Sequence, residues 1–198
     1  MQPSADAAPG PTLEVRPATT VREATAEDWP DIWPIVREVV RAADTFAYDP
    51  SMTEAQARAA WLDAPVRVVV AVRDGVVVGT ANMYPNRPGP GSHIASGSIM
   101  VDRAVRGTGA GRALVEDMIA WARRDGYAAI QFNAVVDTNA GAVHLYESLG
   151  FVTLGVAPGA FRHPELGEVG LRIMWRELRE PSEPREPAAR AATGEAGA

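Results

Sequence analysis

The sequence of 198 residues contains no cysteine and no lysine, so its nineteen basic side chains are all arginine. The absence of cysteine excludes disulfides, thiolate metal ligands and a cysteine-based acyl-enzyme. Only three histidines are present and they are scattered, so we expect no metal site. A Walker A loop for nucleoside triphosphates requires Gly-Lys-Ser/Thr, and the missing lysine argues against that class of site.

The charge balance is acidic, with a formal net charge of −6 and an isoelectric point near 5.1. The chain has no basic stripe, which argues against nucleic acid as a partner. No window approaches the apolar length that a membrane span requires, and the N-terminus lacks the basic start and apolar core of a signal peptide. We therefore expect a cytoplasmic protein with no membrane partner.

Composition divides the chain into three parts. Residues 1–18 and 180–198 are rich in alanine, proline, glycine and glutamate and carry few large apolar groups. Such segments do not bury enough apolar surface to offset the entropy of ordering them, so we predict two flexible tails. A single domain over residues 19–179 lies between them.

Within that domain, β-branched runs alternate with amphipathic segments. Asp74-Gly75 between two valine-rich runs is a strong hairpin signal. The predicted strands cover residues 21–24, 66–73, 76–84, 93–101, 128–136, 151–156 and 169–175. The predicted helices cover residues 25–43, 51–62, 109–124 and 139–149. The order β-α-α-β-β-β-α-β-α-β-β predicts an α/β (α+β) fold with a mixed sheet flanked by helices.

A glycine-rich turn joins the strand ending at residue 101 to the helix that follows. Its glycines let the backbone bend, and the first turn of the helix adds unpaired N–H groups and a positive dipole end, so the turn is suited to a phosphate. The flanking arginines could clamp that phosphate. The turn comprises Arg106, Gly107, Thr108, Gly109, Ala110, Gly111 and Arg112. A dinucleotide fingerprint would need a third glycine in G-x-G-x-x-G, and this alternative is the weaker one.

A second segment, residues 139–151, has the pattern Asn-x-x-Ala-x-x-x-Tyr-x-x-x-Gly-Phe. The glycine turn resembles the Arg/Gln-x-x-Gly-x-Gly/Ala pyrophosphate loop of the GCN5-related N-acetyltransferases (GNAT), and the second segment resembles that family's other signature. Each motif alone also fits an ordinary tight turn or ordinary helix packing. Their order and spacing together indicate the family, over about residues 21–178.

The resemblance implies a mostly antiparallel sheet whose strands 93–101 and 128–136 splay apart around the pantetheine arm of acetyl-CoA. Main-chain groups of Met100 and Val101 would then hold the arm, and the residues of the glycine turn would bind the pyrophosphate. It further implies that Asn139 bonds the pantetheine or helps to orient a water, and that Tyr146 reaches the cofactor sulfur. A phenol there can protonate, or donate a hydrogen bond to, the leaving thiolate. No metal is implied.

The implied reaction is direct acetyl transfer to an amine of a small molecule: an amino acid, an imino-acid analogue or an antibiotic-like amine. Ser96 and Ser98 stand where many relatives carry a carboxylate base, which favours a water relay or an amine that arrives neutral. Asn133, a polar residue among apolar neighbours, is a candidate for acceptor binding. With Asn139 it resembles, more weakly, the branch that acetylates azetidine-2-carboxylate and proline analogues.

Two further candidates for the acceptor pocket, Phe161 and Arg162, fall in a predicted loop between the last two strands, where Arg162 could bind an acceptor carboxylate. A strand edge near residues 151–175 offers a route to a homodimer. Other functions stay open at this level: acetylation of a protein N-terminus or lysine, a non-catalytic acyl-CoA sensor, and a dinucleotide enzyme.

Overall fold

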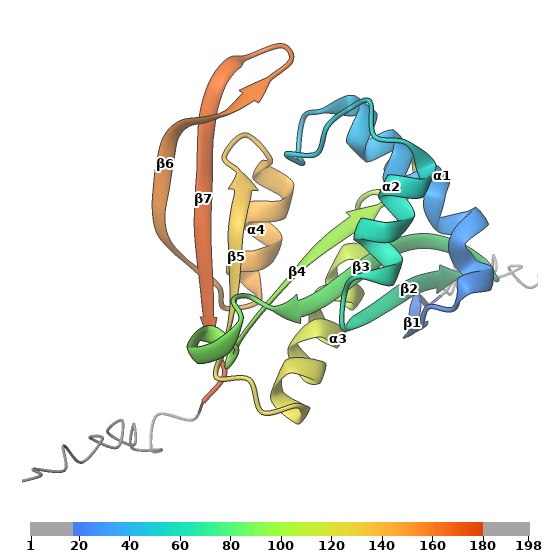
Figure 1. Ribbon diagram of the computed structural model, residues 1–198, viewed down its shortest axis with the longest axis horizontal. Helices are drawn as coiled ribbons and strands as arrows, with labels where there is room; N and C mark the ends of the chain where they lie inside the picture. Colours follow the sequence, from blue (N-terminus) through green and yellow to red (C-terminus); the bar gives the residue numbers. More distant parts are fainter. Residues whose placement is uncertain (1–17, 180–198) are drawn as a thin grey trace, which may run out of the picture.

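The computed structural model describes residues 18–179, and its seven strands form one sheet with helices on both faces (Figure 1). The strands are β1 (Thr20–Glu23), β2 (Arg67–Arg73), β3 (Val76–Pro85), β4 (Ile94–Val101), β5 (Ala129–Val136), β6 (Val152–His163) and β7 (Gly167–Glu177). The longer helices are α1 (Trp29–Ala42), α2 (Glu54–Arg58), α3 (Ala110–Arg124) and α4 (Ala140–Ser148). Short helical turns are η1 (Ala26–Asp28), η2 (Ala59–Asp63), η3 (Gly89–Gly91) and η4 (Arg103–Val105).

The sheet has the strand order β1-β2-β3-β4-β5-β7-β6. Every neighbouring pair is antiparallel except β4 and β5, which run parallel. The predicted element order and the mixed, mostly antiparallel sheet are therefore confirmed. The predicted tails, residues 1–18 and 180–198, lie outside the described residues except for residue 18.

Two predictions of local structure were wrong. The segment expected to be a helix to residue 62 is divided into α2 and the π-helical turn η2. The predicted loop that carries Phe161 and Arg162 lies mostly inside β6, which continues to His163. Register shifts between Thr153 and Gly155, and between Ala157 and Phe161, let this edge strand accommodate its glycines and proline.

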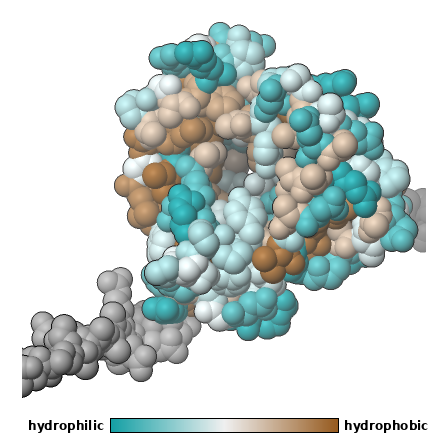
Figure 2. Space-filling model, in the orientation of Figure 1, coloured by the Kyte–Doolittle hydropathy of each residue, from teal (hydrophilic) through white to brown (hydrophobic). Residues whose placement is uncertain are grey.

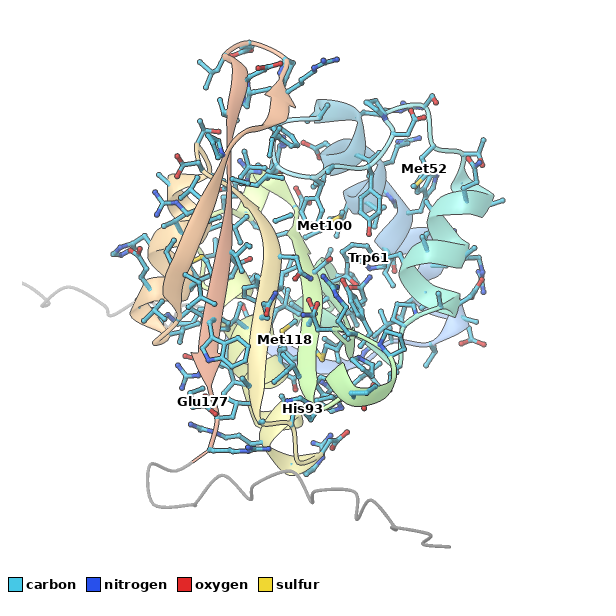
Figure 3. All side chains as sticks on the ribbon, turned by 60° about the vertical axis from the view of Figure 1, so that its left-hand side comes forward. Met52, Trp61, His93, Met100, Met118 and Glu177 are labelled. Atoms are coloured by element: carbon cyan, nitrogen blue, oxygen red, sulfur yellow. The ribbon has the colours of Figure 1, made fainter. Side chains whose placement is uncertain are left out.

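The sheet separates two apolar cores because helices cover both of its faces. In β2, Val69 and Ala71 pack in the core on the α3 side, whereas Val68 and Val70 pack in the core on the α1 side. Successive residues of β2 are buried because helices cover both faces of the sheet at this strand. Figure 3 labels Met118, from the α3 core, together with Trp61 and Met100 from the α1 core.

β6 is one of the two edge strands of the sheet, with β1 at the other edge. β6 carries the exposed apolar side chains Val152, Leu154 and Val156, and Ile173 of β7 is exposed beside them. Apolar surface is visible on this side of the space-filling view, which is also hollowed between the β6–β7 side and the α1–α2 side (Figure 2). The edge position of β6 agrees with the strand edge that the sequence predicts near residues 151–175. The homodimer that this edge would allow stays a prediction. Within residues 18–179, no helix is both long and apolar enough to cross a bilayer.

The hairpin between β2 and β3 turns at Asp74 and Gly75, which have φ angles of 51° and 77°. A turn with two residues at positive φ matches the twist of the flanking strands, as the sequence predicted. An added Cβ at Gly75 would meet no atom within 4 Å, so glycine is required there for its backbone conformation and not for space.

Two alanine substitutions should therefore have opposite effects on the free energy of unfolding. Gly75→Ala places a Cβ at positive φ and should destabilise the fold by about 1 kcal/mol. Gly141→Ala, in α4 with open space around its Cβ, should stabilise it by about 0.5–1 kcal/mol because alanine has the higher helix propensity. Urea denaturation measures both, and shifts of the same sign would contradict the assignment.

Candidate active site

The strands β4 and β5 pair over only two residues. Ile94 faces Ala129 and Ala95 faces Ile130, and beyond these pairs the strands diverge (Figure 1). A register shift in β5 between Phe132 and Val135 accompanies the divergence, as expected because a bulge bends its strand. The gap that follows, the β4–β5 opening, leaves one edge of β4 without a neighbouring strand.

The direction of the main-chain groups of β4 follows from its pairing with β3. The backbone N–H of Asp102 donates to the carbonyl of Val78 at 3.0 Å, and the carbonyl of Ile94 accepts from Asn86 at 2.7 Å. Because such bonds alternate along an antiparallel strand, the even-numbered residues of β4 face β3 and the odd-numbered ones face the opening. Ile99 and Val101 therefore direct their N–H and C=O groups into the opening.

Met100 is placed differently from the expectation. It pairs with Thr80 of β3, and its side chain is only 1% exposed in the core on the α1 side. Its main-chain and side-chain groups both point away from the β4–β5 opening. The expectation differs by one residue because the main-chain groups of successive residues in a strand point to opposite edges. The sequence does not show which residues point to which edge.

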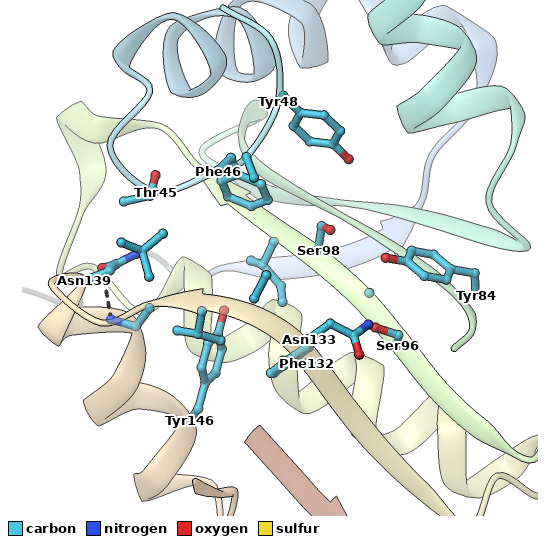
Figure 4. A pocket seen from close by; sticks show the side chains of 17 residues that line it. Thr45, Phe46, Tyr48, Tyr84, Ser96, Ser98, Phe132, Asn133, Asn139 and Tyr146 are labelled. Atoms are coloured by element: carbon cyan, nitrogen blue, oxygen red, sulfur yellow. Dashed lines mark hydrogen bonds between the residues drawn. The ribbon is translucent and has the colours of Figure 1, made fainter. Parts of the chain in front are cut away.

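A cavity of about 230 Å³ occupies the opening (Figure 4). On the α1 side it is lined by Thr45, Phe46 and Tyr48, from the loop that follows α1. On the opposite side it is lined by Ala142 and Tyr146 of α4. The cavity therefore runs through the sheet, which is possible only because the two strands separate.

Tyr146 rises from α4 into the wall of this cavity (Figure 4). Its ring packs against Phe132 and Phe151, with centroids 4.6 and 5.8 Å away. Burial raises the pKa of Tyr146 to about 12. The phenol therefore keeps its proton at neutral pH and can act as a hydrogen-bond donor.

Asn139 caps the N-terminus of α4. Its Oδ1 accepts a hydrogen bond from the N–H of Ala142 at 3.3 Å, which is the ordinary role of an N-cap asparagine. Asn139 also lines the cavity. Since the cap uses the carbonyl oxygen, the amide N–H groups are left for a cavity ligand.

Two of the three glycines of the turn between η4 and α3 bend the backbone as predicted, whereas Gly111 lies inside α3. Gly107 and Gly109 have φ angles of 78° and 96°, and an added Cβ at either would meet no atom within 4 Å. Both glycines are required for their left-handed conformation. The Thr108 hydroxyl closes the turn by donating to the carbonyl of Val105 at 2.7 Å. The turn leads into the N-terminus of α3, where the first N–H groups have no intrahelical partner.

Three arginines surround this turn. Arg106 is exposed, and Arg112 donates to the Ser148 hydroxyl at 2.7 Å. Arg73 donates to the carbonyl of Thr108 at 3.4 Å and was missed by the sequence analysis. It precedes the β2–β3 hairpin, and only the assembled sheet brings that hairpin beside the turn.

The predicted acceptor residues Ser96, Ser98 and Asn133 all line the cavity. Asn133 lies where the register of β5 shifts, and both ends of its amide are engaged. Its Nδ2 donates to Asn86 Oδ1 at 2.6 Å, and its Oδ1 accepts from Gln131 Nε2 at 2.8 Å. The polar side chain is therefore satisfied among its apolar neighbours.

Aromatic residues that the sequence analysis missed complete the lining of the cavity on this side. Phe46 and Tyr48 stack with centroids 6.0 Å apart, and Tyr84 of β3 faces the same cavity. Burial, with a smaller contribution from Tyr84, raises the pKa of Tyr48. Phe46 and Tyr48 lie in a loop without periodicity, so no sequence pattern identified them.

Phe161 and Arg162 do not line the cavity. Phe161 is buried opposite Val169, and the side chain of Arg162 is 90% exposed, with its Nε 3.8 Å from Glu168 Oε1. Their expected place in the acceptor pocket assumed that they lie in a loop. They lie in β6 instead, where both residues pair with β7. His163, also in this strand, accepts N–H groups of the β6–β7 turn through Nδ1.

Within residues 18–179, no aspartate or glutamate lines the cavity, and no group of three histidine or carboxylate side chains is placed to hold a metal. The chemistry available there is that of hydroxyls, amides, phenols and main-chain N–H groups. Such groups can orient a substrate and stabilise a developing negative charge.

The comparisons with known proteins agree with this arrangement. The family model described as "Acetyltransferase (GNAT) family" matches residues 21–151. A GCN5-related N-acetyltransferase from Kribbella flavida is 57% identical, with a TM-score of 0.78, over 81% of this chain and 98% of that one. The structure of yncA from Salmonella typhimurium with its cofactor acetyl-CoA is 27% identical, with a TM-score of 0.73, over 86% and 99%.

A curated relative, N-acetyltransferase aca1 from Schizosaccharomyces pombe, is 35% identical over 86 residues, which are 43% of this chain and 41% of aca1. The chain spans less than half the length of the curated relatives that it matches first.

The raised pKa of Tyr146 predicts a pH-dependent stability. The phenol ionises near pH 10 in the unfolded chain and near pH 12 in the folded chain. Below pH 10 this difference does not change the free energy of unfolding. Between pH 10 and pH 12 it lowers the free energy of unfolding as the pH rises. At pH 11 the loss is about 1 kcal/mol. Between pH 9 and pH 11 the Tyr146→Phe variant should therefore lose about 1 kcal/mol less stability than the parent. Urea denaturation at both pH values tests this, and equal losses would show that Tyr146 titrates normally.

Proposed function

Because the chain belongs to the acetyltransferase (GNAT) family, we propose that it transfers the acetyl group of acetyl-CoA directly to the amine of a small molecule. The observation that carries the proposal is the cavity through the β4–β5 opening, which has Tyr146 in its wall on the α4 side. An amino acid, an imino-acid analogue and an antibiotic-like amine are the acceptor classes considered.

We assign the cofactor to the α3–α4 side. The glycine turn and the N-terminus of α3 suit a pyrophosphate, and Arg73, Arg106 and Arg112 supply positive charge around them. Ile99 and Val101 offer the free main-chain groups that a pantetheine arm requires, and Asn139 offers its amide N–H groups. The acetyl-CoA bound to the relative yncA supports this choice of cofactor.

In the proposed reaction, the acceptor nitrogen attacks the thioester carbonyl carbon while negative charge develops on its oxygen. A main-chain N–H of β4 that faces the opening stabilises this oxygen, and such donors act most strongly where charge develops. The carbon–sulfur bond then breaks and leaves a thiolate. A pKa of about 12 makes Tyr146 a weaker acid than an ordinary thiol near 8.5, so we infer a hydrogen bond to the sulfur and not complete proton transfer.

The nitrogen must lose a proton, and the cavity offers no carboxylate to take it. Ser96 and Ser98 lie on the acceptor side and could hold a relaying water; an acceptor that arrives neutral needs no base. The same absence favours one alternative, a non-catalytic sensor that binds acyl-CoA without turnover. The small cavity, covered by the loop after α1, favours a small acceptor over a protein.

A ligand panel tests the proposal as a whole. Acetyl-CoA at about 100 times its dissociation constant should stabilise the native state by about 2.7 kcal/mol, and NAD and ATP should not. Thiol release is then measured across a set of amines, amino acids and imino acids. Stabilisation with release on one acceptor class supports the transferase, stabilisation without release supports the sensor, and no effect of coenzyme A would overturn the assignment of the glycine turn.

The role of Tyr146 has its own test. Tyr146→Phe should lower kcat by roughly 10²-fold, the loss typical of one transition-state donor, and leave the affinity for acetyl-CoA nearly unchanged. Tyr127→Phe is the matched control, because Tyr127 packs against Trp121 and does not line the cavity. Equal losses of kcat and affinity, or no loss of either, would remove Tyr146 from this role.

A further inference from the structure

We propose that the ion pair between Arg103 and Asp44 couples the phosphate-binding turn to the cover of the acceptor cavity, so that filling the turn orders the cover. Arg103 and Asp44 would thus be positioning residues. The inference rests on the proposed function, because it takes the glycine turn as the site of the cofactor's pyrophosphate. The cover is residues 44–48, which we call the roof segment.

The roof segment is weakly held by its own backbone. Within residues 18–179, no backbone hydrogen bond joins residues 44–48 to another segment. The preceding residue, Ala43, ends α1 in a left-handed conformation with φ of 50°, which is unfavourable for alanine. Local preference therefore does not fix the direction in which the chain leaves α1, and side-chain contacts must do so.

The strongest polar contact of the roof segment is made by Asp44. Arg103 Nη2 donates to both of its carboxylate oxygens, at 2.8 and 2.7 Å. Both side chains are partly buried, with exposures of 31% and 25%. Burial opposes ionisation, but the hydrogen bond and charge of Arg103 lower the pKa of Asp44 overall. Asp44 Oδ1 also accepts from the Thr45 hydroxyl at 3.2 Å, which extends the contact to a residue that lines the cavity.

Arg103 is in turn joined to the glycine turn. It begins η4, whose first N–H groups are capped by Asp102 through Ala104 at 2.8 Å. The N–H of Arg106 donates to the carbonyl of Arg103 at 3.4 Å, and that of Thr108 donates to Val105 at 3.3 Å. Two consecutive hydrogen-bonded turns, over residues 103–106 and 105–108, thus connect Arg103 with Gly107, in the loop where the pyrophosphate is proposed to bind.

Other contacts of these residues do not supply the same link. Glu38 Oε1 lies 3.6 Å from Arg103 Nε, too far for a hydrogen bond, and within the described residues that buried Nε has no hydrogen-bond partner. Phe46 packs edge-on against Trp61 with centroids 6.4 Å apart, which anchors the roof segment to the α1–α2 core and not to the turn. Within the described residues, the carboxylate of Asp44 is therefore the side-chain group that connects the roof segment to Arg103, and through Arg103 to the glycine turn.

The consequence is an order of events. An anion on the glycine turn immobilises η4 and Arg103, and the ion pair passes that restraint to Asp44 and Thr45. The acceptor then enters a cavity whose cover is already in place. Coupling of this kind is a property of the two sites together, so it disappears when the ion pair is removed even if each site remains intact.

The test uses 3′-phosphoadenosine 5′-diphosphate, which carries the pyrophosphate of coenzyme A but no pantetheine arm that could touch the roof segment. Hydrogen–deuterium exchange of the full chain is followed by mass spectrometry with and without this probe. In the parent protein, saturating probe should slow exchange in residues 44–50 at least about fivefold. In Arg103→Gln the slowing should vanish while the probe still raises the unfolding midpoint.

Asp44→Asn removes the other partner and should give the same result, which guards against a folding defect peculiar to one variant. Arg103→Lys, which keeps a charge, should restore part of the slowing. Arg58→Gln is the control, because it breaks an exposed ion pair with Asp63, at 3.7 Å, that is remote from the turn. It should behave as the parent does.

The outcomes separate the two proposals. If neither the probe nor acetyl-CoA raises the unfolding midpoint of the parent protein, the proposed function fails. If the midpoint rises but exchange in residues 44–50 does not slow, or slows equally in Arg103→Gln, the coupling is overturned and the transferase proposal stands.

Discussion

The divergence of β4 from β5 is the constraint on which the rest of the site depends. Parallel strands normally continue their hydrogen-bond ladder, and here the ladder ends after two residue pairs. Beyond it, Ile99 and Val101 retain main-chain donors and acceptors that no strand satisfies. Because unpaired backbone groups are costly when they are buried, this edge is suited to a ligand that brings its own amide groups.

The opening survives because neither strand depends on the other for its position. β4 is paired with β3 along its length, β5 is paired with β7, and helices pack on both faces of the sheet. The two apolar cores hold the strands apart from opposite sides, with Met100 in one core and Phe132 in the other. A cavity lined mainly by neutral side chains can therefore pass through an otherwise continuous sheet without an ion pair to hold it open.

Charge is distributed unequally around this cavity. Arg73, Arg106 and Arg112 gather at the glycine turn, whereas the cavity wall carries phenols, hydroxyls and amides. An anionic ligand is favoured at one end, and orientation by hydrogen bonds is favoured at the other. The ion pair of Arg103 with Asp44 lies between these two regions. Through this contact, an anion bound at the glycine turn would order the roof segment over the neutral cavity.

Much of this protein could be predicted from its sequence because the features concerned are local. Left-handed glycines at 107 and 109, the turn at Asp74-Gly75 and the cap at Asn139 each depend on a few consecutive residues, and so does the alternation that sets the order of strands and helices. Tyr146, singled out by motif spacing, and Asn133, singled out as a polar residue in an apolar strand, both line the cavity, and their roles stay predictions.

The tertiary structure decided what depends on distant segments meeting. Asn86 reaches Asn133 across 47 residues, Arg73 reaches Thr108 across 35, and Arg103 reaches Asp44 across 59. The register of β4 turned Ile99 in place of Met100 toward the opening, and the pairing of β6 with β7 drew Phe161 and Arg162 away from it. Local conformational energies fix turns, caps and element types, but strand register and contacts between elements follow from how the whole sheet packs between its two layers of helices.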